Sequence, residues 1–194
     1  MKSEFLDVPD GQIAAVVTHL QMFERPAARA VPHVNATLVE YPKPDLDWYR
    51  DLFSRVGTDW LWFSRQGMVD DELVKIVHND HVLVHAVQVN GRAEGLLELD
   101  FRVDGECELG FFGLTETMVG TGAGRWLMEK ALDKAWGRPI SRLHVHTCTL
   151  DSPQALPFYM RSGFTAYRRQ IEIADDPRKT GALPAKASPQ EPII

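Results

Sequence analysis

Three features of this sequence could take part in the transfer of a chemical group. Tyr159 carries a phenol, which can donate a proton to a departing atom without being a charged group itself. Glu98, Asp100 and Glu108 lie on two predicted neighbouring strands, where a partly desolvated carboxylate could accept a proton. Glycines alternate with other residues over 120–124, just before a predicted helix whose free N–H groups and dipole favour an anion. The pattern predicts an anion-binding turn.

The glycine turn alone does not identify its ligand. No Gly-Lys-Ser or Gly-Lys-Thr follows it, which excludes a P-loop. The glycine spacing also differs from that of a dinucleotide fingerprint, and no short turn joins the preceding strand to the glycines. A glycine-rich loop that binds nothing is an equally good interpretation of this stretch taken by itself.

A second segment strengthens the functional interpretation. Residues 143–150 are β-branched and alternating, which predicts a strand. Ser152 followed by proline predicts a helix N-cap with proline at the first helical position, and Gly163 is the expected left-handed end of that helix. Pro157 falls inside the same helix, so we expect a kink or a loosened first turn.

Together the two segments resemble the GNAT superfamily of acetyl-CoA-dependent N-acetyltransferases over residues 95–173. The family's pyrophosphate motif, Gln/Arg-x-x-Gly-x-Gly/Ala, is matched at Gly122 and Gly124. Its second motif, Ala-x-x-x-Tyr-x-x-x-Gly-Phe, is matched by Ala155, Tyr159, Gly163 and Phe164. Two positions depart from the family pattern: Val119 stands where glutamine or arginine is usual, and Ser152 stands where asparagine is common.

The resemblance implies that acetyl-CoA is the cosubstrate and that the glycine turn binds it. The residues implied for this contact are Val119, Gly120, Thr121, Gly122, Ala123, Gly124, Arg125 and Ser152. In the family, backbone N–H groups near the end of the strand before the turn polarise the acetyl carbonyl. The corresponding residues here are Phe112, Gly113 and Leu114.

The resemblance also suggests the acid and the base. The family places a tyrosine that protonates the departing thiolate at the position of Tyr159. Glu108 precedes Gly122 by the interval at which histone-type members carry a catalytic glutamate, and its apolar neighbours should raise its pKa. Alternatively, Glu106 and Glu108 simply form the solvent face of a strand and deprotonation occurs through water. Glu98 is the reserve candidate for the base.

The predicted elements form one mixed α/β domain. Strands are expected at 12–23, 36–41, 81–89, 93–103, 106–114, 143–150 and 165–173, with helices after 45, 70, 124 and 152. This order gives an antiparallel meander followed by a βαβ crossover. The family resemblance implies that the strands at 106–114 and 143–150 splay apart so that the pantetheine arm of the cofactor inserts between them.

Composition limits the class of protein further. The 194 residues suit a single domain at 1–174, followed by a tail at 175–194 that is flexible or packed on a partner. A formal charge of −6 argues against a nucleic-acid binder. The two cysteines lie on predicted strands, and no signal peptide or membrane span is evident, so we expect reduced thiols and a cytoplasmic location. A homodimer is possible.

Histidines and aromatic residues raise two further possibilities. His78, His81, His85, His144 and His146 show no ligand set at diagnostic spacing, so packing or surface roles are favoured and no metal is expected. The aromatic run Trp60, Trp62 and Phe63 is more typical of packing than of a substrate wall. The family lines its acceptor site with this region, so the run is also the best specificity candidate.

The resemblance therefore implies an N-acetyltransferase in which an amine attacks the bound thioester directly. The acceptor could be a small amine, an antibiotic-like amine or a peptide amino group, and the sequence does not decide between them. A non-catalytic acyl-CoA-binding module of the same fold is the alternative function. A dinucleotide-binding domain is a third possibility, which predicts binding of NADH that acetyl-CoA does not displace.

Overall fold

A computed structural model describes residues 5–194 and contains a seven-stranded mixed sheet with four α-helices. The strands are β1 (Gln12–Met22), β2 (Thr37–Glu40), β3 (Val82–Val89), β4 (Arg92–Asp100), β5 (Glu106–Leu114), β6 (Arg142–Cys148) and β7 (Thr165–Asp175). The helices are α1 (Leu46–Gly57), α2 (Asp70–Val77), α3 (Ala123–Trp136) and α4 (Ala155–Arg161). The expected mixed α/β fold is confirmed.

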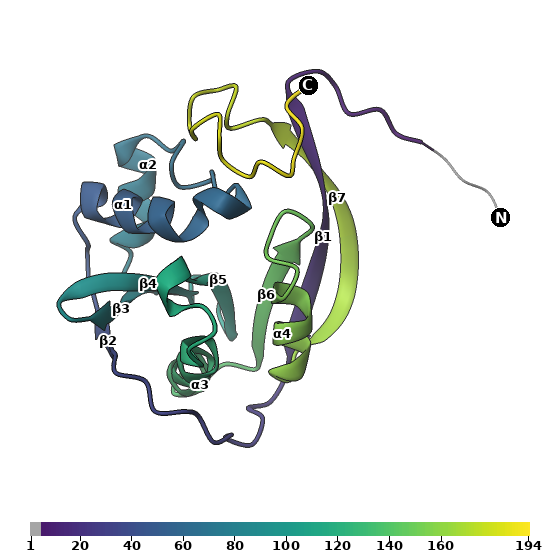
Figure 1. The fold of residues 1–194 in the computed structure, drawn as a ribbon. Coiled ribbons are helices and arrows are strands. Elements are labelled where there is room, and N and C mark those ends of the chain that lie inside the picture. The colour runs from purple at the N-terminus through teal and green to yellow at the C-terminus, as the bar shows by residue number, and fades with distance from the viewer. Residues whose placement is uncertain (1–4) are drawn as a thin grey trace.

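The sheet has the order β2-β3-β4-β5-β6-β1-β7. Strands β2 to β5 form the expected antiparallel meander, and α3 crosses over to β6, which is parallel to β5. The first strand does not join this meander. It lies antiparallel between β6 and β7 at the other end of the sheet, so residues 23–36 must run back across the molecule to reach β2 (Figure 1).

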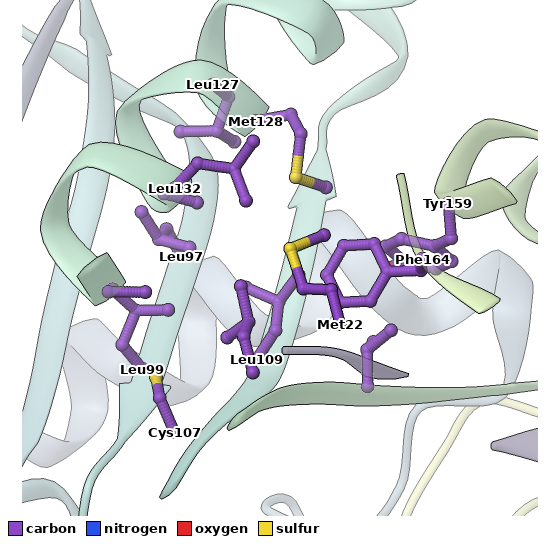
Figure 2. Close-up of a cluster of buried hydrophobic side chains, with 14 of the residues drawn as sticks. Met22, Leu97, Leu99, Cys107, Leu109, Leu127, Met128, Leu132, Tyr159 and Phe164 are labelled. Carbon is purple, nitrogen blue, oxygen red and sulfur yellow. The ribbon is translucent and has the colours of Figure 1, made fainter. Parts of the chain in front are cut away.

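Helices cover the two faces of the sheet separately. On one face, α1 and α2 pack on β3 and β4 through Tyr49, Phe53 and Leu73. On the other face, α3 contributes Leu127, Met128 and Leu132, which lie over Leu97, Leu99 and Leu109 of the sheet (Figure 2). Helix α4 adds Tyr159 to this second core. The alternation of side chains along each strand therefore decides which helices a residue meets.

The sequence predicted the end of helix α4 correctly, but the helix starts later than predicted. Gly163 has the expected positive φ of 101° after the helix. The helix begins at Ala155 rather than at Pro153, with Gln154 as its N-cap residue. This shift puts Pro157 in the first turn, where its missing N–H would have no helical partner, so the proline removes no hydrogen bond of the helix.

The C-terminal tail, residues 176–194, packs on its own domain, which differs from the flexible or partner-bound tail expected from composition. Its Leu183 and Ala187 are buried with Leu61 and Leu150. Arg178 is buried, with 1% of its side chain exposed. It binds Asp176 and donates to the carbonyls of Ala187, Ser188 and Glu191. These bonds hold the tail in a compact loop above β6 (Figure 1).

Candidate active site

The glycine turn leads directly into the N-terminus of α3. Gly120 and Gly122 have φ values of 78° and 88°, a backbone region that side chains with a Cβ rarely adopt. The amides of Gly120, Thr121, Gly122 and Gly124 make no hydrogen bond of ordinary geometry with residues 5–194. Four free donors at the positive end of a 14-residue helix favour a phosphate group. This geometry fits the pyrophosphate of a coenzyme A ligand.

Side chains around the turn contribute little by comparison. Val119 is 69% exposed and Arg125 is also exposed, so neither is held in place by packing. The Thr121 hydroxyl donates to the carbonyl of Met118, 2.8 Å away, and this bond stabilises the turn. Ser152 lies on the loop after β6, where its hydroxyl accepts a hydrogen bond from the amide of Gln154 at 3.3 Å. A ligand at the turn would therefore meet mostly backbone.

The connection between β1 and β2 passes over this turn. We call residues 23–36 the strap. A Cβ at Gly122 would lie 2.3 Å from a Pro32 side-chain atom, so the strap forms one wall of the glycine turn. Arg29 ties the strap to both flanking helices, since it pairs with Glu129 of α3 and donates to the carbonyl of Arg161 in α4. The sequence did not predict this crossing, because it depends on where β1 lies in the sheet.

The strands β5 and β6 part beside the turn. Their parallel pairing ends at Glu108 and His144, whereas β5 stays paired with β4 up to Leu114 and β6 stays paired with β1 up to Cys148. The edge of β5 at residues 112–114 therefore faces a widening gap. This geometry matches the splayed strands that the family resemblance implied.

A β-bulge changes the direction of the side chains before the end of β5. The register moves from Leu99 opposite Leu109 to Glu98 opposite Phe111, which leaves Gly110 as the extra residue. Unbroken alternation along this strand would place Leu109 and Phe111 on one face. In the structure Leu109 packs towards α3, whereas Phe111 packs towards α1 and α2.

Gly113 needs to be a glycine for a packing reason. A Cβ there would lie 2.4 Å from the Val56 side chain and 2.9 Å from the ring of Trp62. Helix α1 and the Trp62 ring are therefore in close contact with the backbone of β5 at the position implied to polarise the acetyl carbonyl. Neighbouring Phe112 points to the opposite face, where its ring stacks on Phe158.

Tyr159 lies in the core on the α3 side. The residue is 7% exposed, and its ring makes edge contacts with Phe112, Phe158 and Phe164. Burial raises the pKa of its phenol, and the charge of Asp151 raises it further. The Tyr159 hydroxyl is not one of the fully buried polar atoms that are left without a hydrogen bond among the described residues. The phenol therefore stays protonated at neutral pH and is a weaker acid than a free tyrosine side chain.

Glu108 occupies the other face of β5, but its pKa moves against expectation. Its carboxylate lies 3.4 Å from Nδ1 of His146, which projects from β6. The hydrogen bond with His146 lowers the pKa of Glu108, and the nearby charge of His144 lowers it further, which outweighs the effect of burial. The prediction that apolar neighbours raise this pKa is therefore wrong. It considered residues adjacent in sequence and missed the two histidines that the parallel pairing brings alongside.

Glu98, the reserve candidate for the base, is fully buried and already engaged. Its Oε2 accepts a hydrogen bond from the Tyr49 hydroxyl at 2.7 Å, and its Oε1 binds Arg65 at 2.6 Å. The Arg65 guanidinium also lies over the ring of Phe111 at 5.1 Å. This triad of Tyr49, Glu98 and Arg65 fills the space under α1. Both oxygens of Glu98 are therefore engaged, whereas the Glu108 carboxylate is partly exposed. Arg65 carried no motif that could have revealed it.

The aromatic run divides between two clusters. Trp62 packs on Phe53 and Phe111, and its indole N–H donates to Asp151 at 3.1 Å. This bond links the segment after α1 to the loop that follows β6. Phe63 packs instead with the buried tail residues, and Trp60 is half-buried. Of the three aromatic residues, Trp62 lies beside the end of β5.

Other candidate sites lie elsewhere on the molecule. Within residues 5–194, no three His, Cys, Asp or Glu side chains come together as a metal-ligand set. A surface hollow of about 670 Å³ lies beside the edge strand β2 and is lined by His33, Asn35, Tyr41 and Gln88, away from the parted strands. None of the helices in the described chain has the length and apolar character needed to cross a membrane.

Comparison with known proteins gives one family. The sequence model of the acetyltransferase (GNAT) family matches residues 46–164. None of the curated proteins matches the chain significantly by sequence.

Solved structures share the fold at low identity. A putative acetyltransferase of the GNAT family from Novosphingobium aromaticivorans has a TM-score of 0.58 and 15% identity, with 88% of this chain and 69% of that chain covered. A GCN5-related N-acetyltransferase from Sphaerobacter thermophilus has a TM-score of 0.59 and 13% identity; 87% of this chain spans 53% of that one. An aminoglycoside acetyltransferase from an uncultured soil metagenomic sample has a TM-score of 0.57 and 13% identity, covering 71% of this chain and 93% of that chain.

Proposed function

The chain belongs to the acetyltransferase (GNAT) family, and from this premise we propose that it moves an acetyl group from acetyl-CoA to a primary amine. The amine attacks the thioester directly while both substrates are bound. The observation that carries the proposal is the pairing of a four-amide glycine turn at α3 with the parted edge of β5. The first feature suits a pyrophosphate, and the second leaves room for an extended arm.

The residues of this chain divide the chemistry between the two faces of the sheet. Acetyl-CoA supplies the activated acetyl group. We infer that the backbone N–H groups of residues 112–114 that are not bonded to β4 polarise its carbonyl, since this stretch of β5 lies beyond the last pairing with β6. On the α3 side, Tyr159 holds the proton that the departing thiolate needs. On the α1 and α2 side, Glu108 brings negative charge, which favours a cationic ammonium acceptor, whereas Glu106 is paired with Arg142 at 3.1 Å.

A non-catalytic acyl-CoA-binding module is the alternative function. Such a module would keep the glycine turn but lack a working acid and base. The two functions differ in turnover and agree in binding. Titration calorimetry with acetyl-CoA, and with NADH as the control ligand, tests the cofactor first. We expect micromolar binding of acetyl-CoA alone.

Tyr159→Phe then separates the enzyme from the binding module. Loss of the hydroxyl should lower kcat by about 10²-fold or more while acetyl-CoA affinity is retained, because the phenol acts on the leaving sulfur. Tyr41→Phe is the matched control, since its hydroxyl accepts a hydrogen bond from Gln88 at 2.6 Å, beside the edge strand β2. Normal turnover by Tyr159→Phe would refute the acid assignment. Acetyl-CoA binding by the wild type without turnover on a broad amine panel would favour the module.

A further inference from the structure

We propose that His146 is the group that accepts the proton of the acceptor amine, and that Glu108 positions it. The proposal rests on the proposed acetyl transfer and assigns a further residue to it. His146 lies on β6 and was interpreted from sequence as a surface or packing residue. In the structure it forms a carboxylate–imidazole dyad with the glutamate that the family resemblance implied as the base.

The geometry of the dyad sets the tautomer of the imidazole. Nδ1 of His146 lies 3.4 Å from Oε1 of Glu108, and this carboxylate can only accept a hydrogen bond when ionised. A carboxylate at this distance favours the tautomer of the neutral ring with its proton on Nδ1 and its lone pair on Nε2. No hydrogen bond joins Nε2 to another residue in the described part of the chain, and 52% of the side chain is exposed. Nε2 is available to a ligand.

The dyad lies at the point where the central strands separate. Glu108 and His144 form the last pair between β5 and β6, so His146 is the next residue of β6 on the same face. Leu143 and Val145 point into the α3 core, which places His144 and His146 on the opposite face with α1 and α2. The dyad and Tyr159 therefore flank the gap between the strands from opposite faces of the sheet.

The proposed step consists of proton transfers and acyl transfer alone and requires no additional reactant. Nε2 of His146 removes a proton from the acceptor ammonium, directly or through one water, and the neutral amine then attacks the acetyl carbonyl. The imidazolium keeps its proton on Nδ1, next to Glu108. The negative charge of Glu108 stabilises the positive ring. The leaving sulfur takes a proton from Tyr159, and the second proton of the attacking nitrogen returns to the Tyr159 oxygen through water, so that the phenol is restored. Solvent exchange through the exposed Nε2 returns His146 to its neutral form.

Several charged groups face His146 and decide where it titrates. The hydrogen bond to Glu108 raises its pKa most, burial opposes this, and the charges of Glu108, Asp151 and Glu172 raise it further. His144 on its own strand has a pKa lowered by burial, so it adds little positive charge at neutral pH. His19 of β1 lies opposite, with ring centroids 5.8 Å apart. A raised pKa makes the His146 imidazole a stronger base than a free histidine side chain.

Three variants test the dyad through the pH dependence of kcat/KM. The wild type should lose activity at acidic pH with one protonation, at the pKa of His146. His146→Gln should lower kcat by about 10²–10⁴-fold and remove that acidic limb. Glu108→Gln should keep a limb but move it to lower pH, because the carboxylate that favours the imidazolium is gone. His144→Gln, on the same face and two residues away, is the matched control and should leave the limb in place.

A second readout does not depend on activity. Histidine ring resonances of the free protein, followed by NMR against pH, should give His146 a pKa above the ordinary 6.5, and Glu108→Gln should lower it. The kinetic limb and the NMR titration should agree. Unchanged kcat and acidic limb in His146→Gln would overturn the dyad and leave the acetyl transfer standing. An absence of turnover in the wild type with every amine would overturn both.

Discussion

Replacing Glu98 with glutamine should destabilise the fold without abolishing acetyl transfer. The Glu98 carboxylate is fully buried, and it is the partner of Arg65, whose side chain is 12% exposed. Glutamine keeps the shape and can still accept from the Tyr49 hydroxyl, but it leaves the guanidinium without its counterion. Nε of Arg65 already has no hydrogen-bond partner among the described residues. The variant therefore leaves the charge of the Arg65 guanidinium buried without a counterion.

The expected size follows from the cost of an unpaired buried charge. Removing one member of a buried ion pair typically costs about 3–5 kcal/mol. We expect the lower end, about 3 kcal/mol, because the glutamine amide still offers a hydrogen-bonding oxygen. For a chain of this length, each kcal/mol lowers Tm by about 2–4 °C, so the fall should be about 6–12 °C. Urea denaturation and calorimetry measure the two quantities independently.

A triple variant provides the control for Glu98→Gln. Glu98→Leu, Arg65→Met and Tyr49→Phe together remove every polar member of the triad. Exchanges of a buried ion pair for apolar side chains are often neutral or stabilising. The triple variant should therefore be more stable than Glu98→Gln alone. A loss below about 1 kcal/mol in Glu98→Gln would show that Arg65 is solvated. A loss of activity above about 100-fold in a folded protein would make Glu98 the base.

Two further predictions concern pH and the tail. Burial lowers the pKa of His85 to about 4, so the unfolded chain takes up a proton between pH 6.5 and 4 that the folded chain does not. The free energy of unfolding should fall by about 2–3 kcal/mol as pH drops through this window, and His85→Gln should flatten the urea-derived profile; an equal fall in the variant would refute the assignment. Arg178→Met should release the tail, because the arginine bonds to Asp176 and to carbonyls of the tail. Limited proteolysis with trypsin should then show faster cleavage after Lys186. Unchanged resistance to trypsin would show that the folded tail does not depend on Arg178.

Local signals in the sequence predicted the helices, the strands and the backbone conformation of the glycine turn well. Asp45 caps α1, with its carboxylate accepting from the amide of Trp48 at 2.9 Å. Gly122 and Gly163 adopt the positive φ values that their places at helix ends suggested. Each of these features depends on a few adjacent residues, so propensity and spacing carry enough information to find them.

Features that depend on distant strands were not predictable in the same way. The bulge at Gly110 exists because β4 and β5 change register, and a strand read alone gives no sign of it. His146 gained its interpretation only when β6 was placed parallel to β5, beside Glu108. Pro32 reaches Gly122 only because β1 lies at the far end of the sheet. Tertiary pairing, rather than local preference, decides all three.

The position of β1 has a consequence for how the protein is made. Leu20 lies opposite Val145, 125 residues later in the chain, so β1 leaves the ribosome well before its first partner strand. At about 5–20 residues per second, the wait is roughly 6–25 s. During that time an apolar strand has no sheet to join and offers its edges to other chains. Nascent chains arrested before residue 142 should therefore recruit chaperones or aggregate, whereas chains released after β7 can bury the strand at once.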